Sequence, residues 1–157
     1  MSLPAKRHPT FNHVAMSVAA DLLDEAGRAA MLDFYGQVFG WTELPTLTAD
    51  RERLVLRAYN HEQFVFLVAD PEPLTAPAMD HFGMSVESLD ELHGMRERAL
   101  AYARRDDDVE VTDVNVEDYG AVKLHGFYVR YRWPLRVEVQ CFEWQQGVDP
   151  TRAPPEA

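Results

Sequence analysis

Apolar and polar positions alternate along two short segments of the chain, a pattern typical of β-strands with one buried face. Residues 13–18 read H-V-A-M-S-V and residues 81–86 read H-F-G-M-S-V, so four of the six positions are identical. In each segment the apolar side chains fall on one face, and a histidine with small residues falls on the other. This repetition predicts a tandem duplication of one supersecondary module.

A helical pattern follows each of these strands. Between residues 31 and 39 apolar residues recur at i, i+3, i+4 and i+7, and Gly40 follows as a C-terminal cap. We read residues 19–27 as a connection that ends at Gly27. In the second copy, Ser88-Leu89-Asp90-Glu91 has the capping-box signature S-x-x-E, which predicts a helix beginning there.

Strand patterns then complete each module, so the order β-α-β-β-β repeats and the fold class is α+β. The segment 109–117 alternates with one irregularity, which indicates a bulge, and Trp133-Pro134 marks a hairpin turn. We expect one domain, residues 1–157, with module one at 11–70, a Pro-rich linker at 71–78, module two at 79–144 and a tail at 145–157. The expected strands after the helices are 41–48, 53–59, 63–69, 109–117, 122–132 and 135–144.

Composition narrows the classes of function. The 157 residues carry a formal net charge of −11, which argues against a nucleic-acid partner because such proteins need a basic face. No apolar run approaches the roughly 20 residues of a membrane span, so we expect no membrane partner. Residues 1–10 lack a signal-peptide core, and the single cysteine, Cys141, allows no internal disulfide. We therefore expect a cytoplasmic protein.

The last strand pattern places a carboxylate at an informative position. Val137, Val139 and Cys141 share one face, and the opposite face carries Glu138, Gln140 and Phe142. If the apolar face meets the helix, Glu138 points to the same side as His13 and His81. Two histidines and one carboxylate suit a divalent metal and leave coordination positions open.

The pattern alone leaves a second interpretation open. The two histidines can be ordinary polar residues at the starts of strands. Glu138 can lie at a sheet edge, where it meets solvent or an arginine such as Arg130 or Arg136. A buried carboxylate is costly only when it has neither a partner nor a cation.

These residues resemble the vicinal oxygen chelate superfamily, the group of glyoxalases, bleomycin-resistance proteins and extradiol dioxygenases. The resemblance covers residues 11–144 and includes the helix end from Leu32 to Trp41, which is similar to the family pattern F-Y-x-x-x-L-G-W. It implies two βαβββ modules whose mixed sheets form an open barrel around a metal cleft. Family ligands come from the first strand of each module and from a last strand, positions that match His13, His81 and Glu138.

The resemblance also favours one branch of the family. Glyoxalase-like members place a carboxylate on the last strand of module one, but Phe64–Val68 holds none. That favours three ligands, as in extradiol dioxygenases and fosfomycin-inactivating thiol transferases. Phe127-Tyr128 resembles the aromatic pair of the extradiol enzymes. The turn at 131–135 departs from the family's D-P-x-G, and no acid–base histidine is clearly placed, with Gln63 nearest to that position.

Two hypotheses from different classes follow. The first is an enzyme resembling extradiol dioxygenases, with Fe(II) or Mn(II), or alternatively Zn or Ni, bound by His13, His81 and Glu138. A small-molecule substrate would bind through vicinal oxygens, with Tyr128 donating a hydrogen bond to it. Proton transfer would fall to His61, Gln63 or His125, and the substrate pocket would include Phe66, Gln140 and Phe142.

The second hypothesis is a metal-free binding protein like the bleomycin-resistance members, which sequester a cationic ligand. The charge of −11 fits this equally well. Glyoxalase, thiol-transferase or isomerase chemistry on the same fold is a further alternative, because a fold does not fix a function. The resemblance implies a homodimer in each case.

Overall fold

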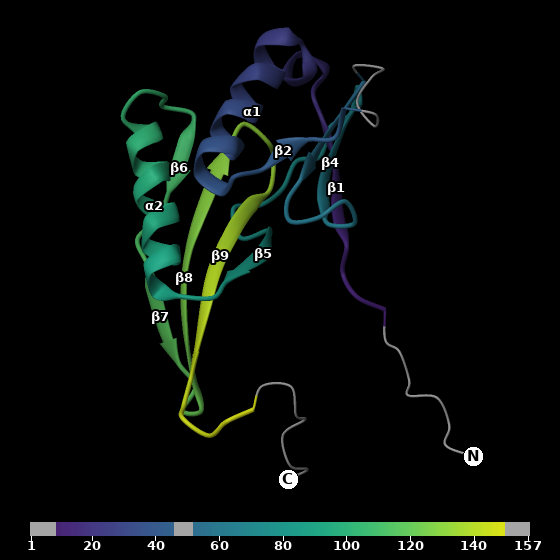
Figure 1. Ribbon diagram of the computed structural model, residues 1–157. Helices are drawn as coiled ribbons and strands as arrows, with labels where there is room; N and C mark the ends of the chain where they lie inside the picture. Colours follow the sequence, from purple (N-terminus) through teal and green to yellow (C-terminus); the bar gives the residue numbers. More distant parts are fainter. Residues whose placement is uncertain (1–8, 46–51, 150–157) are drawn as a thin grey trace, which may run out of the picture. The chain divides into compact units, whose positions relative to one another are not determined.

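The chain divides into two compact units in the computed structural model, which describes residues 9–45 and 52–149 (Figure 1). The first unit runs through Gly36 and includes Gly40–Leu74. The second comprises Gln37–Phe39 and the residues from Thr75 onward. The division between Leu74 and Thr75 falls inside the Pro-rich segment 71–78.

The first unit contains one mixed sheet. Its strands are ordered β1-β4-β3-β2, with β1 parallel to β4 and the other pairs antiparallel. Its elements are β1 (His13–Val18), the 3-10 helix η1 (Ala20–Leu23), α1 (Glu25–Phe39, of which the last three residues belong to the second unit), β2 (Thr42–Glu43), β3 (Arg53–Arg57) and β4 (Phe64–Ala69).

The second unit repeats this topology. Its sheet is ordered β5-β9-β8-β6, with β5 parallel to β9, and β7 also pairs with β8. α2 lies along one face of this sheet (Figure 1). Its elements are β5 (His81–Val86), α2 (Leu89–Ala103), β6 (Val109–Val111), β7 (Asn115–Asp118), β8 (Val122–Tyr131) and β9 (Arg136–Trp144). The α+β class and the two mixed-sheet βαβββ modules are therefore confirmed.

The predicted alternation holds in β1 and β9, whereas the three central residues of β3, Leu54, Val55 and Leu56, are all buried. In β1 the side chains of Met16 and Val18 are buried and His13 is exposed. In β9 the side chains of Val137, Val139 and Cys141 are buried. The intervening side chains lie on the opposite face, which we call the open face of each sheet.

The start of α1 differs from the prediction. The predicted connection extended to Gly27, but the helix begins at Glu25 and Gly27 lies inside its first turn. The Asp24 side chain caps the helix by accepting a hydrogen bond from Gly27 N over 2.7 Å. A Cβ at residue 27 would lie only 2.3 Å from the carbonyl oxygen of Leu22. The glycine thus permits close packing of the helix start and does not end a connection.

Other boundaries follow the sequence pattern more closely. The capping box of α2 is present, with Ser88 and Glu91 bonded reciprocally. The predicted strand 109–117 is divided into β6 and β7 by a bulge. Of the predicted strand 41–48, β2 covers Thr42–Glu43, and residues 46–48 lie outside the described ranges, as do residues 150–157 of the tail. No helix in the described parts of the chain is both long and apolar enough to span a membrane.

Candidate metal centre

Glu138 lies near the middle of the open face of the second sheet. β9 has β5 on one side and β8 on the other, so Glu138 stands opposite Gly83 and opposite Tyr128. Gly83 carries no side chain, and a Cβ there would come no closer than 3.6 Å to any neighbouring heavy atom, the nearest being Gln140 Oε1. The sheet therefore leaves room beside the carboxylate.

His81 and Glu138 form the central pair of this face. His81 Nε2 lies 3.1 Å from Glu138 Oε2, and the two side chains are 33% and 16% exposed. The other ring nitrogen, Nδ1, lies 2.7 Å from the carbonyl oxygen of Met79. A carbonyl only accepts, so Nδ1 carries a proton, and Nε2 is the ring nitrogen that faces the carboxylate. Either a proton on Nε2 or a cation must lie between Nε2 and the carboxylate oxygen.

Tyr128 completes the cluster. Its ring meets the His81 ring edge-on, with centroids 5.1 Å apart. Burial raises the pKa of the Tyr128 phenol, and its hydrogen bond to Glu138 raises that pKa further, while the Arg136 guanidinium opposes the rise. Tyr128 therefore remains a proton donor at neutral pH. The register confirms the predicted shared face of Tyr128 and Glu138.

His13 in the first unit has the same internal arrangement as His81. Its Nδ1 lies 2.7 Å from Asn12 Oδ1, and its ring stacks on Phe64 with centroids 4.9 Å apart. An oxygen acceptor again fixes the proton on Nδ1 and leaves Nε2 as a donor to a metal.

The sheet registers show which residue of the first unit corresponds to Glu138. Glu138 pairs with Gly83, the third residue of β5, and Phe66 pairs with Ala15, the third residue of β1. The carboxylate position of the second unit is thus occupied by a phenylalanine in the first. This agrees with a set of three protein ligands.

The three predicted ligands divide between the two units. His81 and Glu138 belong to the second unit and His13 to the first. Within residues 9–45 and 52–149, no group of three or more His, Cys, Asp or Glu side chains is arranged to hold a metal ion. The complete triad stays a prediction, whereas the His81–Glu138 pair is observed, and its atoms suit a divalent cation.

The predicted proton-transfer residues fall in different places. His61 and Gln63 lie in the exposed turn between β3 and β4, where Gln63 uses its backbone to bond Asn60 and Ala58. Their roles stay predictions.

His125 is separated from the cluster by the sheet itself. It pairs with Cys141, so its side chain lies on the face opposite to Glu138, where its Nε2 is 2.7 Å from Glu143 Oε2. This placement argues against the relay role predicted for His125. The sequence held the signal, because His125 lies an odd number of residues before Tyr128 on one uninterrupted strand.

The predicted pocket residues extend the open face. Gln140 and Phe142 follow Glu138 on the same side of β9, and Gly126 opposite Gln140 again adds no side chain. Phe142 is 45% exposed, and its ring stacks with that of Trp144. Phe66 lies on the open face of the first sheet.

Two supporting atoms were not predicted. Asn12 directly precedes His13 in the sequence and could have been found as its orienting partner. The carbonyl of Met79 belongs to the backbone, and no side-chain pattern reports where a backbone carbonyl points.

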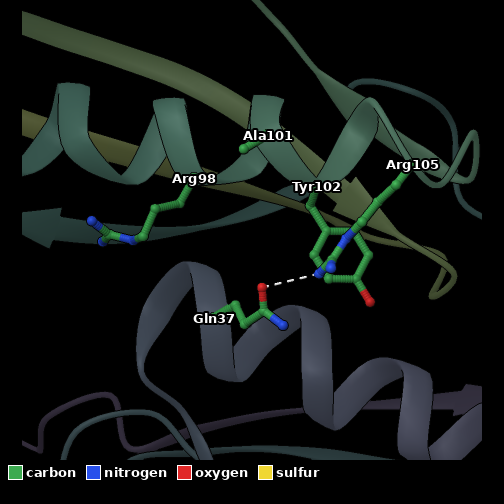
Figure 2. Close-up of a pocket in the computed structure, with 5 residues that line it drawn as sticks. All are labelled: Gln37, Arg98, Ala101, Tyr102 and Arg105. Carbon is green, nitrogen blue, oxygen red and sulfur yellow. Dashed lines mark hydrogen bonds between the residues drawn. The ribbon is translucent and has the colours of Figure 1, made fainter.

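A separate hollow of about 370 Å³ lies within the second unit, beside α2 (Figure 2). It contains none of the predicted site residues. Arg98 donates two hydrogen bonds to the carbonyl oxygen of Val38, and Arg105 donates one to Gln37 Oε1 over 3.0 Å. These cations bond the C-terminal turn of α1, where positive charge is stabilising, so we assign the hollow no functional role.

The sequence matches no protein-family model and no curated protein. Solved structures do resemble it. A lactoylglutathione lyase from Agrobacterium tumefaciens is 19% identical, with a TM-score of 0.57 over 87% of this chain and 96% of that chain. A fosfomycin resistance protein from Listeria monocytogenes is 15% identical, with a TM-score of 0.57 over 86% and 94%. A glyoxalase/bleomycin resistance protein/dioxygenase family enzyme from Burkholderia phytofirmans is 13% identical, with a TM-score of 0.59 over 83% and 96%. At these identities the likeness establishes the fold.

Proposed function

We propose, from the vicinal oxygen chelate fold that this chain shares with glyoxalase, bleomycin-resistance and dioxygenase proteins, that it is a metal-dependent enzyme. It would bind a small-molecule substrate through two adjacent oxygens, with His13, His81 and Glu138 as metal ligands. The supporting observation is the His81–Glu138 pair, in which Nε2 lies 3.1 Å from a carboxylate oxygen. That arrangement is suited to a cation.

The metal we favour is Fe(II) or Mn(II), because two imidazoles and one carboxylate are the ligand set of non-haem iron oxygenases. Such an ion would lower the pKa of the substrate oxygens and support chemistry with dioxygen, whereas Zn or Ni would serve isomerase- or glyoxalase-like reactions. Glu138 supplies the negative charge of the ligand set. Met79 and Asn12 hold the two histidines with Nε2 available.

Tyr128 is the residue we propose to contact substrate. The phenol carries a single O–H, which would turn from Glu138 to a substrate oxygen when substrate binds. Gln140, Phe142 and Phe66 would line the substrate pocket. Proton transfer is left to His61 or Gln63.

Oxygen consumption tests this proposal. Protein loaded anaerobically with Fe(II) is mixed with a panel of catechols, and dioxygen uptake is recorded for wild type, Y128F, E138Q and H125A. We expect uptake in wild type, abolished uptake in E138Q, and a rate about 10- to 100-fold lower in Y128F through loss of one strong hydrogen bond. H125A, whose side chain lies on the opposite face, should keep the wild-type rate. Metal-loaded wild type that consumes no dioxygen with any catechol would contradict the dioxygenase assignment.

A metal-free binding protein is the second candidate. The exposed, stacked rings of Phe142 and Trp144 on the open face favour it, because such rings bind flat or cationic ligands without a metal. The net charge of −11 would attract a cation. Chelator-treated protein would then bind an aromatic cation with quenching of tryptophan fluorescence, and W144A would lose that binding.

Glyoxalase, thiol-transferase and isomerase chemistry are further alternatives on this fold. The number of protein ligands to the metal helps to distinguish among them. Phe66 stands where a glyoxalase-like fourth ligand would be expected, so we rank glyoxalase chemistry below the three-ligand reactions. Zn or Ni in the purified protein would reverse that order.

A further inference from the structure

A bulge interrupts the edge of the second sheet opposite Tyr128. β6 ends at Val111, which pairs with Val129, and β7 resumes at Asn115, which pairs with Gly126. Three residues on this edge therefore face two on β8, and Tyr128 is one of those two. The regular hydrogen bonds between paired strands are therefore interrupted on the β6–β7 side of Tyr128.

Thr112, the first residue of the bulge, supplies the missing bonds. Its N–H donates to the carbonyl oxygen of Tyr128 over 3.0 Å, and the Tyr128 N–H donates to Thr112 Oγ1 over 2.9 Å. The Thr112 hydroxyl in turn donates to the carbonyl oxygen of Asp113 over 3.1 Å. One residue therefore bonds both backbone polar groups of Tyr128.

Contacts of Arg96 in α2 explain why the Tyr128 N–H donates to the hydroxyl of Thr112 and not to its carbonyl oxygen. Its Nε donates to the carbonyl oxygen of Thr112 over 2.8 Å, and its Nη2 lies 2.7 Å from Asp113 Oδ1. The Thr112 carbonyl thus points toward α2, where it accepts the bond from Arg96 and cannot accept the Tyr128 N–H. Bonds from a charged guanidinium are stronger than neutral ones, so they hold the bulge in this form.

We infer that Thr112 and Arg96 are positioning residues that hold the Tyr128 backbone so that its ring lies against His81 and on the same face as Glu138. We call the contacts of Thr112 and Arg96 with this segment the brace. Its importance for catalysis rests on the proposed function, in which Tyr128 contacts substrate. The phenol oxygen lies at the end of a long rigid side chain. A small backbone rotation at residue 128 would therefore move it away from the carboxylate.

The ring contact between Tyr128 and His81 reports directly on the brace, because the two ring centroids lie 5.1 Å apart. It is measured as the NOE between the ring protons of the two residues, in metal-free protein containing ¹³C-labelled tyrosine and with Tyr128 assigned by Y128F. T112V keeps the β-branched shape but removes the acceptor of the Tyr128 N–H, and it should weaken or abolish this NOE. T112S keeps the hydroxyl and should give the wild-type NOE.

R96M provides a second, independent variant, which decides the matter if T112V does not fold. It leaves the Thr112 hydroxyl in place but releases the carbonyl, and it should weaken the same NOE between Tyr128 and His81. An unchanged NOE in either folded variant, even with a lower melting temperature, would overturn the inference and leave the bulge a purely structural feature. Because the measurement needs no metal, a protein that binds none would refute the proposed function and leave the brace standing.

Discussion

At the scale of single residues, the candidate site depends on how Tyr128, His81 and Glu138 share protons. Met79 fixes the proton on His81 Nδ1, and Tyr128 donates to Glu138. The Glu138 carboxylate therefore lies beside both His81 and Tyr128. Removal of the Glu138 carboxylate should therefore change the surroundings of both His81 and Tyr128.

E138Q should lower the phenol pKa of Tyr128, because it removes the negative charge and the strong acceptor that raise this pKa. Burial remains, so part of the elevation should persist. The raised pKa stabilises the fold below the ordinary tyrosine pKa of about 10, and this contribution is lost as pH rises through the native value. In E138Q that alkaline loss should begin at lower pH.

NMR titration of Tyr128 checks this expectation. E143Q is the matched control, since Glu143 lies beside His125 on the opposite face. An equal shift in both variants would contradict a specific Tyr128–Glu138 bond.

Much of the residue-level site could be predicted because period-two alternation assigns a face to every residue of a strand. The shared face of Tyr128 and Glu138 followed from parity. Parity also separates His125 from them, and the resemblance-based role overlooked it. The Thr112 contacts could not be predicted, since a bulge changes parity and its bonds depend on where one backbone carbonyl turns.

At the scale of elements, α2 is flanked by a capping box at its start and by a part-buried side-chain bond just beyond its end. The Ser88–Glu91 capping box begins the helix, and beyond its end Tyr131 donates to Asp106 Oδ2 over 2.7 Å. The helix start was predictable because its signature is local. The start of α1 was not, because Gly27 is required by its closeness to Leu22, which no periodicity reports.

S88A should reduce the free energy of unfolding by about 1 kcal/mol, because the first turn of α2 loses its side-chain cap. Urea denaturation measures the loss. S85A, an exposed serine on the open face of β5, serves as the control and should change stability little. Equal losses in the two variants would show that the cap contributes nothing.

Y131F should destabilise the protein by about 1 kcal/mol at neutral pH through loss of its bond to Asp106. This bond is the main reason that the Asp106 pKa is lowered. A lowered carboxyl pKa stabilises the fold above its unfolded value and loses that effect as pH falls through the native value. The difference between wild type and Y131F should therefore shrink below the ordinary aspartate pKa.

Urea denaturation at neutral and acidic pH tests this dependence. Y119F is the control, because Tyr119 bonds Glu117 on an exposed surface. A Y131F deficit that stayed constant down to low pH would contradict the linkage.

At the scale of the whole molecule, the chain is a duplication whose two halves have diverged at one decisive position. Both units keep a histidine at the start of the first strand, but only the second keeps a carboxylate on the last. The duplication and fold class were visible in the sequence, because the repeated strand carries them. The proposed ligand set of His13, His81 and Glu138 draws on both units, and no local pattern of the sequence encodes how distant segments meet.

We propose that the protein is a homodimer, as the fold resemblance implies. Sedimentation-velocity ultracentrifugation should give the mass of two chains at micromolar concentration. A species with the mass of one chain across the whole concentration range would contradict this.

Metal content tests the central proposal most directly. Wild type, H13A, H81A, E138A and the control H125A are purified anaerobically, reconstituted with Fe(II) or Mn(II), desalted and assayed by elemental analysis. The proposed triad predicts about one metal ion per chain in wild type and H125A, and loss of the metal in the other three. Wild type that retains no metal, or H13A that retains as much as wild type, would contradict the triad.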